Sequence, residues 1–452
     1  MTVTTDSATT AAARHEIDLL RLATAGSVDD GKSTLVGRLL YDTKSVLADQ
    51  IDAVTRASVD KGLDTPDLSL LVDGLRAERE QGITIDVAYR YFATPARSFV
   101  LADTPGHVQY TRNTVSGAST AQLVILLVDA RTGVVEQTRR HAAVMSLLGV
   151  PQLVLAVNKI DLVDDAAERF TQIRADFAEL TTSLGWTADR VVAIPVSALH
   201  GDNIASRSAN TPYYDGPSLI EHLESVDNDP DQIIAADPQA VRRPIGLRFP
   251  VQYVIRPRTA EYPDYRGYAG QIAAGEVSVG DEVVVLPSGV RTTIARIDTA
   301  DGERAHAHTG RSVTLVLADD VDASRGDLIA AVDGAPEPIS QFSATVCWLG
   351  DNPLRPGARL LLKHGTRTTQ AIVGTLDALF DEQTLSVHAA PESVALNQIG
   401  RISVRTAEAI AADDYSVNRD TGSFLLIDPQ TGNTLGAGLV GDALEHLHLP
   451  AS

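Results

Sequence analysis

One stretch near the start of the chain has the residue types and spacing of a phosphate-binding loop. Residues 26–33 read GSVDDGKS and match the pattern G-x-x-x-x-G-K-[ST]. The two glycines allow the backbone to wrap closely round phosphates, and successive amides and the following helix N-terminus direct positive charge inward. Lys32 is placed to contact the β- and γ-phosphates, and the Ser33 hydroxyl is placed to ligate Mg2+. A chance match in a Gly-rich turn is the alternative.

A second motif, at residues 103–106, follows an apolar run of strand length and reads DTPG. At the end of a buried strand the Asp103 carboxylate could hold Mg2+ through a water, and Gly106 lets the backbone approach the γ-phosphate. Upstream of it, Thr84 is placed to ligate Mg2+ with its hydroxyl and the γ-phosphate with its amide. Thr84 would release both after hydrolysis and allow its segment to relax.

A third motif, at residues 158–161, reads NKID after another apolar run and would select the base. Asp161 can accept hydrogen bonds from N1 and N2 of guanine, which adenine cannot supply. Asn158 would support O6 and the loop, and the stem of Lys159 would cover the base. Residues 197–199 follow the next apolar run and would close the pocket with backbone amides. An NKxD turn alone is usually only a solvated turn, but these motifs, in this order and at strand ends, favour a guanine-nucleotide site.

The residues that we expect to bind GTP or GDP are Gly26, Ser27, Val28, Asp29, Asp30, Gly31, Lys32, Ser33, Thr34, Thr84, Asp103, Thr104, Pro105, Gly106, Asn158, Lys159, Asp161, Ser197, Ala198 and Leu199. Those expected to hold Mg2+ are Ser33, Thr84 and, through a water, Asp103.

The elements that must position these motifs are short apolar runs separated by helical patterns. Continuous Val, Ile and Leu are typical of strands buried on both faces, so the runs predict an α/β domain with a mainly parallel sheet covered by helices. Ligands of such sheets bind beyond the carboxyl ends of the strands. We expect a mobile insertion at 44–67, where the sequence is polar and unpatterned. The predicted strands are 19–25, 98–102, 123–128, 153–157 and 191–196.

Short strands with Gly and Pro turns follow a linker at about 228–244 and predict two small antiparallel β-barrels. The first would contain strands at 246–254, 268–275, 282–286, 291–298 and 312–317, with a tight connection at 276–281. The second would contain strands at 342–349, 358–364, 368–379, 398–407 and 423–427. His306 and His308 are expected in a polar loop as solvated side chains. The expected domains are a flexible tail (1–15), a GTPase domain (16–230) and the two barrels (231–335 and 336–452).

The composition suits a globular protein of two to four domains, since the chain has 452 residues. A single cysteine excludes an internal disulfide and suits a reducing cytoplasm. No apolar run approaches the roughly 20 residues needed to span a bilayer, and residues 1–13 suggest a frayed tail rather than a signal peptide. The formal net charge of -21 argues mildly against nucleic acid as a partner. We therefore expect a cytoplasmic protein that binds neither membranes nor nucleic acid.

Together these motifs resemble the translational family of GTPases, which includes elongation factor Tu. This resemblance implies that His107 orients the attacking water and that Val28 forms one side of an apolar gate in front of it. The alternative for His107 is a solvated residue of the switch segment.

A closer resemblance is to the GTPase (large) subunit of ATP sulfurylase, the bacterial sulfate adenylyltransferase. Asp30 stands where elongation factors usually have histidine, and residues 28–42 read VDDGKSTLVGRLLYD. The similarity continues through LVDGL at 71–75 to NRDTGSF at 418–424. Val108 departs from the glutamate of many members.

That resemblance implies that GTP hydrolysis drives the uphill formation of adenosine 5′-phosphosulfate and diphosphate from ATP and sulfate. The adenylyl-transfer site would lie on a separate small catalytic subunit, in a heterodimer or larger assembly. Some relatives carry an adenylylsulfate kinase as a C-terminal extension; since this chain ends at Ser452, we expect any such kinase to be a separate protein. The alternatives are an elongation-factor-like GTPase delivering tRNA or a release factor to the ribosome, and an isolated regulatory GTPase. Asp30 and the motif at 418–424 count against the first of these.

Overall fold

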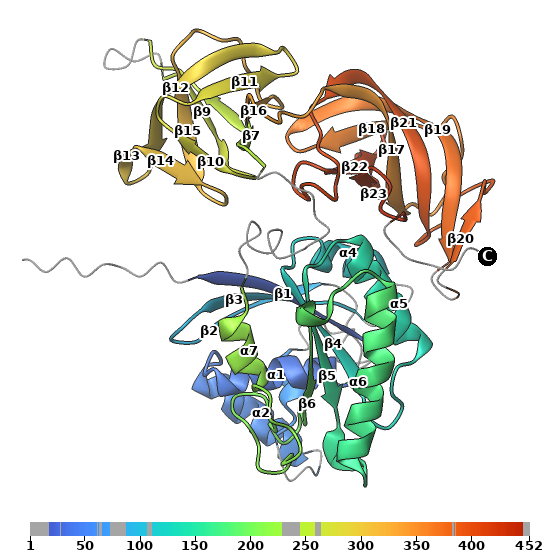
Figure 1. Ribbon diagram of the computed structural model, residues 1–452. Helices are drawn as coiled ribbons and strands as arrows, with labels where there is room; N and C mark the ends of the chain where they lie inside the picture. The colour runs from blue at the N-terminus through green and yellow to red at the C-terminus, as the bar shows by residue number, and fades with distance from the viewer. Residues whose placement is uncertain are drawn as a thin grey trace, which may run out of the picture.

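The computed structural model describes residues 18–27, 29–60, 62, 66–72, 87–105, 111–227, 245–257, 264–381, 384 and 386–445. In the described chain, helices and strands alternate up to residue 227, and every regular element after residue 245 is a strand. Figure 1 shows an α/β part below and two β units side by side above it. The order of elements therefore agrees with the expected α/β domain followed by β-barrels.

Six strands form the sheet of the α/β part, in the order β2-β3-β1-β4-β5-β6. β3, β1, β4, β5 and β6 are parallel, whereas β2 pairs antiparallel with β3 at the edge. The prediction of a mainly parallel sheet is confirmed, but β2 was missed. Its side chains alternate, with Tyr89 and Tyr91 exposed and Phe92 buried, so the sequence has no continuous apolar run there. The strands are β1 (Leu19–Gly26), β2 (Ala88–Ala93), β3 (Ser98–Asp103), β4 (Leu123–Asp129), β5 (Gln152–Asn158) and β6 (Val191–Pro195).

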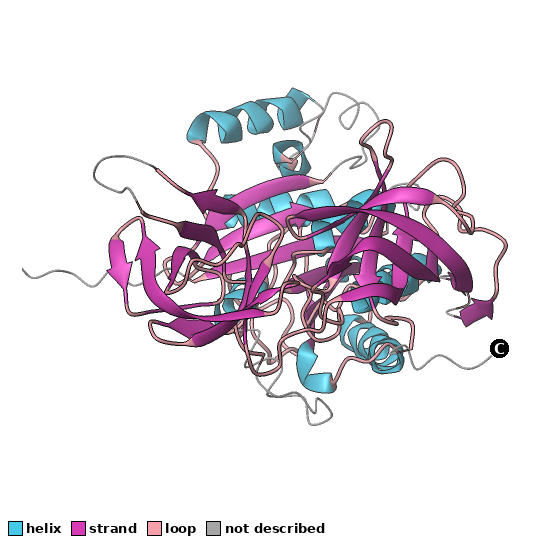
Figure 2. Cartoon of the chain, turned by 90° about the horizontal axis from the view of Figure 1, so that it is seen from above, coloured by secondary structure: helices cyan, strands magenta, loops and turns pink. Residues whose placement is uncertain are grey.

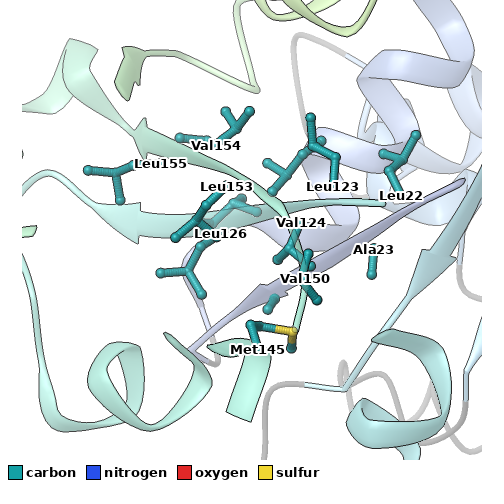
Figure 3. Packing of buried hydrophobic residues seen from close by; sticks show 14 of the residues in the cluster. Leu22, Ala23, Leu123, Val124, Leu126, Met145, Val150, Leu153, Val154 and Leu155 are labelled. Carbon is teal, nitrogen blue, oxygen red and sulfur yellow. The ribbon is translucent and has the colours of Figure 1, made fainter. Parts of the chain in front are cut away.

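The centre of this sheet is the core that fixes the loops at the strand ends. Every residue of β4 and β5 is buried. Their side chains pack with Leu22 and Ala23 of β1 and with Met145 of α5 (Glu136–Leu147), as Figure 3 shows. Burying one such aliphatic side chain contributes roughly 1.5–3 kcal/mol. The carboxyl ends of β1, β3 and β5, which carry predicted motifs, are therefore held by the most buried part of the domain.

Helices cover both faces of the sheet, with α5 and α6 on one side and α1 and α7 on the other (Figure 1). The α-helices besides α5 are α1 (Lys32–Asp42), α2 (Ala48–Asp60), α4 (Thr111–Ala118), α6 (Ala166–Ser183) and α7 (Leu219–Ser225). Short 3-10 helices are η1 (Leu68–Leu71), η3 (Ile160–Leu162) and η4 (Ala188–Arg190).

Helix α2 lies within the segment 44–67, which was expected as a mobile insertion and for which no helix was predicted. Its buried side consists of Val54 and Ser58, four residues apart, which is too narrow for the hydrophobic pattern to reveal. The Ser58 hydroxyl donates to the Val54 carbonyl at 2.8 Å and accepts from the Asp67 amide at 2.8 Å. These bonds tie the helix to the start of η1, against which it packs.

The remaining strands form two antiparallel β-barrels, drawn in magenta in Figure 2. In the first barrel, the strands lie in the order β7-β16-β11-β12-β15-β9-β8. A bridge between Arg248 and Ala274 brings the two ends of this sheet towards each other. In the second, β18 pairs with both β22 and β19, so the order β18-β22-β23-β17-β21-β19 forms a ring. The first has β7 (Arg248–Pro250), β8 (Tyr253–Ile255), β9 (Gly267–Gln271), β10 (Glu276–Ser278), β11 (Glu282–Leu286), β12 (Val290–Thr299), β13 (Gly302–Arg304), β14 (His306–His308), β15 (Ser312–Leu317) and β16 (Leu328–Ala331). The second has β17 (Ile339–Trp348), β18 (Arg359–His364), β19 (Arg367–Asp381), β20 (Ser386–Ala389), β21 (Ile399–Ile410), β22 (Ser423–Ile427) and β23 (Thr434–Val440).

Short strands in these barrels correct two sequence predictions. His306 and His308 lie in β14, not in a loop, and are exposed on either side of the buried Ala307. β10, which pairs with β14, occupies the first half of the connection predicted at 276–281, and the turn itself is restricted to 278–281. β13, β16, β20 and β23 were also not predicted, because each is short or rich in small residues.

Polar contacts join the three parts of the chain. Between the barrels, the Arg248 guanidinium makes two hydrogen bonds with the Asp413 carboxylate, at 2.9 and 3.0 Å, and both side chains are buried. Between the second barrel and the α/β part, Tyr415 donates to the Leu148 carbonyl at 2.7 Å. Arg419, from the predicted 418–424 motif, donates to the carbonyls of Ser119 at 2.6 Å and Ala121 at 3.0 Å, just after α4. The motif thus forms a contact between the C-terminal barrel and the α/β part.

Candidate nucleotide-binding site

The phosphate-binding loop connects β1 to α1, in the strand–loop–helix context that the motif requires. Gly26 and Gly31 have φ of 149° and 93°, which a residue with a side chain rarely adopts. A Cβ atom on Gly31 would lie 2.4 Å from Nδ2 of Asn158, and one on Gly26 would lie 2.9 Å from the Leu127 carbonyl oxygen. The loop is therefore packed tightly against β4 and β5, which leaves no room for a side chain at either glycine.

Lys32 and Asp30 are the buried charges of this loop. The Lys32 ammonium donates to the carbonyls of Gly26 at 2.8 Å and Ser27 at 2.7 Å, which bends the loop back over the helix N-terminus. Burial lowers the pKa of Lys32, and this effect outweighs the nearby carboxylates of Asp103 and Asp30, which raise it. The Asp30 carboxylate accepts from the Ser27 amide at 2.6 Å, and its burial raises its pKa although that bond and Lys32 oppose the rise.

Asp103 and Thr104 lie at the carboxyl end of β3, beside the phosphate-binding loop. The Asp103 carboxylate accepts from the Thr24 hydroxyl at 2.8 Å, and the Thr104 hydroxyl donates to the Thr24 carbonyl at 2.5 Å. Both side chains are fully buried. An ammonium, a helix N-terminus and a carboxylate thus converge on one strand end, and this donor set fits the phosphates of a nucleotide with a hard cation such as Mg2+.

The NKxD motif follows β5 and is bonded directly to the phosphate-binding loop. Asn158 donates from Nδ2 to the Asp30 carbonyl at 2.7 Å and accepts at Oδ1 from the Ala198 amide at 2.9 Å. Lys159, in the left-handed conformation with φ of 59°, donates to the Asp29 carbonyl at 2.5 Å. Since these bonds join three segments far apart in sequence, the base loop and the phosphate loop form one frame.

Asp161 and residues 197–199 flank this frame. The Asp161 carboxylate lies 3.8 Å from Nε2 of His200 and borders a cavity of about 330 Å³. Ser197 and Ala198 are buried, whereas the Leu199 side chain is exposed. The structure therefore brings together the predicted phosphate and base motifs at the carboxyl ends of neighbouring strands.

Three polar residues around the frame were not predicted, although each lies at a strand end or within a sequence motif. Asp129 ends β4 and forms an ion pair of 3.0 Å with Lys159. Burial would raise the pKa of Asp129, but hydrogen bonds from Arg131 and Lys159 lower it to about 2. Arg38 and Asp42, an ion pair of 3.5 Å on α1, belong to the stretch 28–42 on which the resemblance was based. Their places at a strand end and within the motif mark them as polar residues near the site, but the groups that they hold are known only from the fold.

Val28, Thr84, Gly106, His107 and Val108 lie outside the described residues.

Comparison with known proteins supports the interpretation of the site. Residues 18–236 match the elongation factor Tu GTP binding domain, and residues 341–441 match the GTP-eEF1A C-terminal domain-like family. The chain is 55% identical over 423 residues to the bifunctional enzyme CysN/CysC of Mycobacterium tuberculosis, covering 93% of this chain and 67% of that protein. The chain belongs to the family of sulfate adenylyltransferase GTPase subunits, within the translational GTPase superfamily.

Other relatives agree with this membership. The bifunctional enzyme NodQ of Rhizobium meliloti is 49% identical over 93% of this chain and 64% of its own length. The chain thus spans about two thirds of the length of these curated relatives. Crystal structures of sup35 complexed with GDP and with GMPPNP are 21% and 22% identical over 94% of each chain, with TM-scores of 0.42 and 0.41. The family match over residues 18–236 and the two curated bifunctional relatives show a GTP-binding enzyme of this superfamily, and they do not favour the delivery of tRNA or a release factor as its role.

No helix of the described residues is long and apolar enough to cross a membrane.

Proposed function

We propose that this chain is the GTP-hydrolysing subunit of a sulfate adenylyltransferase. It couples GTP hydrolysis to the formation of adenosine 5′-phosphosulfate and diphosphate from ATP and sulfate. The observation that carries this proposal is the frame of Asn158 and Lys159 bonded to the phosphate-binding loop, in a chain 55% identical to a CysN/CysC enzyme. Because the adenylyl transfer from ATP to sulfate is uphill, coupling it to GTP hydrolysis supplies the free energy that drives it forward.

The phosphates of GTP bind at the N-terminus of α1. The Lys32 ammonium already faces the loop, and amides of residues 29–34 and the helix dipole add positive charge in a site buried from water. Ser33 and, through a water, Asp103 hold Mg2+, which neutralises charge on the β- and γ-phosphates. Thr104 and Pro105 fix the end of β3 from which the next segment approaches the γ-phosphate. Thr34 completes the first turn of the helix.

The guanine base is selected by the Asp161 carboxylate, which accepts from N1 and N2. The stem of Lys159 covers one face of the base, and the ion pair with Asp129 keeps that stem in place. Asn158 and residues 197–199 line the O6 edge. A site built to satisfy donors of the substrate discriminates strongly against a base that lacks them, because its own polar groups would be left unpaired.

Hydrolysis requires the segments that contain Thr84, Gly106 and His107. The roles of Thr84 and Gly106 rest on the sequence motifs, and that of His107 rests on the resemblance. His107 orients the attacking water, with Val28 as one side of the gate before it. Thr84 senses the γ-phosphate and releases it after hydrolysis, and Gly106 contributes its amide. These roles are geometric and electrostatic, as phosphoryl transfer requires.

The partner is the small catalytic subunit that carries the adenylyl-transfer site. The two barrels, placed at 231–335 and 336–452 after a GTPase domain at 16–230, transmit the state of the nucleotide to that partner. The formal net charge of -21 argues mildly against nucleic acid as a further partner. The complex works in the cytoplasm.

The test is diphosphate release from ATP and sulfate by the complex purified with its small subunit. We expect release to rise when GTP is added and to stay low with a non-hydrolysable GTP analogue. Release that is the same with and without GTP would contradict the coupling. Purification with ribosomes or RNA, and no small protein, would favour the elongation-factor alternative instead.

A further inference from the structure

Arg38 lies two turns along α1 from the phosphate-binding loop and reaches the segment that closes the base pocket. Its Nε donates to the Ala198 carbonyl at 3.2 Å, and one terminal nitrogen donates to the Leu199 carbonyl at 2.5 Å. The other terminal nitrogen pairs with Asp42, one turn further along, at 3.5 Å. The planar guanidinium is thus engaged on three sides, an arrangement that the single ammonium of a lysine cannot reproduce.

The segment held by Arg38 is a compact turn. The Gly201 amide donates to the Ser197 carbonyl at 2.7 Å, and the Ser197 amide donates to the Asp202 carbonyl at 3.3 Å. A Cβ atom on Gly201 would lie 3.5 Å from a terminal nitrogen of Arg38, so the guanidinium also packs against the backbone of the turn. With 17% of its side chain exposed, Arg38 is shielded from most of the solvent that would weaken these bonds.

Fixing two carbonyls fixes two amides, because each peptide unit is planar and trans. With the carbonyls of Ala198 and Leu199 directed at Arg38, the amides of Leu199 and His200 point the opposite way. The His200 amide donates to the Ser197 hydroxyl at 3.3 Å within the turn, which leaves the Leu199 amide as the donor for a ligand. The Ala198 amide is held by Asn158, on the other side of the turn. The backbone donors next to the base loop therefore have a set direction before any nucleotide binds.

We propose that Arg38 is a positioning residue for guanine recognition, which aligns the amide of Leu199 with O6 of the base. This inference rests on the proposed function, since it assumes that the NKxD loop binds guanine. One helix then positions both ends of the nucleotide: its N-terminus holds the phosphates, and Arg38 sets the O6 edge of the base pocket.

The test compares three nucleotides in binding to Arg38→Ala. GDP has O6 and N2, inosine 5′-diphosphate keeps O6 but lacks the N2 amine, and 2-aminopurine riboside 5′-diphosphate lacks O6. The Kd for GDP and for inosine diphosphate is expected to rise about tenfold, or about 1.4 kcal/mol, and that for the 2-aminopurine nucleotide by less than about twofold. Arg56→Ala is the matched control, because Arg56 is an exposed arginine of α2 that bonds only within its own helix among the described contacts.

An equal loss for all three nucleotides would reduce Arg38 to a general structural role and overturn the proposal, as would no loss at all. If Arg38→Ala does not fold, Arg38→Lys keeps the charge without spanning both carbonyls and is expected to show the same selective loss at smaller size. Binding to the unaltered protein distinguishes failure of the proposed function from failure of the role of Arg38. If it does not prefer GDP to ADP, the proposed function fails; if it does and the variants lack the O6-dependent loss, only the role of Arg38 fails.

Discussion

Replacing Asp129 with asparagine is expected to destabilise the α/β domain by about 2 kcal/mol at neutral pH. The Asp129 side chain is 6% exposed and is bonded to Arg131 at 2.6 Å and to Lys159 at 3.0 Å. These partners lower its pKa from 3.8 to about 2. Since one pKa unit corresponds to about 1.4 kcal/mol of differential interaction, the folded state gains about 2 kcal/mol from the ionised carboxylate.

The sign of the pH dependence follows from the direction of that shift. A carboxyl group whose pKa is lowered by folding contributes its stability above the pKa of the unfolded chain, 3.8, and loses it as the pH falls towards 2. The difference in the free energy of unfolding between the unaltered protein and Asp129→Asn should therefore reach about 2 kcal/mol at pH 7 and become smaller below pH 4.

The assay is urea unfolding followed by the emission of the buried Trp186, which lies in the core of the α/β domain. Asp189→Asn is the control, because Asp189 is exposed and pairs only with its neighbour Arg190 at 3.4 Å among the described ion pairs; a change within about 0.5 kcal/mol is expected there. Faster release of GDP should accompany the Asp129 variant, since Lys159 loses the partner that holds it over the base. Equal stability of Asp129→Asn and the unaltered protein at pH 7 would refute the reasoning.

Three further predictions follow from the same structure. Asp161→Asn should weaken GTP binding by about 3 kcal/mol, or more than a hundredfold, and favour xanthosine triphosphate, because two charge-assisted bonds are lost; an unchanged preference in competition binding would undo the base assignment. His107→Ala should lower kcat for GTP by roughly 10²–10⁴-fold in single-turnover assays with little change in Kd, because only the positioning of water is removed, and a normal rate would exclude that role. Arg248→Ala should destabilise the contact between the barrels by about 3–5 kcal/mol in urea unfolding, because it leaves Asp413 charged and buried. The matched Arg266→Ala, whose partners Asp320 and Asp322 are exposed, should change stability by less than about 1 kcal/mol; equal effects would contradict the role given to burial.

The parts of the fold that could be predicted from the sequence are those whose residues are buried on both sides. β4 and β5 are continuous Val, Ile and Leu, and their bounds lie within a residue or two of the prediction. β2 and β14 were missed because an edge strand needs only every second side chain buried, and Tyr89, Tyr91, His306 and His308 face solvent. α2 was missed because just two of its side chains are buried.

In the site, the residues that contact the nucleotide could be predicted from the sequence, whereas those that hold them in place could not. The residue types that touch a nucleotide are dictated by chemistry, so the loop at 26–33 and the NKxD motif could be found from spacing alone. The residues that hold those groups in place could not, because the bonds of Arg38 to Ala198 and of Asp129 to Lys159 join segments that meet only in three dimensions. Their identity depends on which carbonyls and ammonium groups the fold brings within 3 Å or so.

The most direct test of the central claim is a calorimetric titration of GDP into the folded protein with Mg2+. A site framed by the phosphate-binding loop and Asp161 predicts saturable binding of GDP, with ADP giving no comparable heat at the same concentrations. Absence of heat with GDP, or equal binding of ADP, would contradict the account.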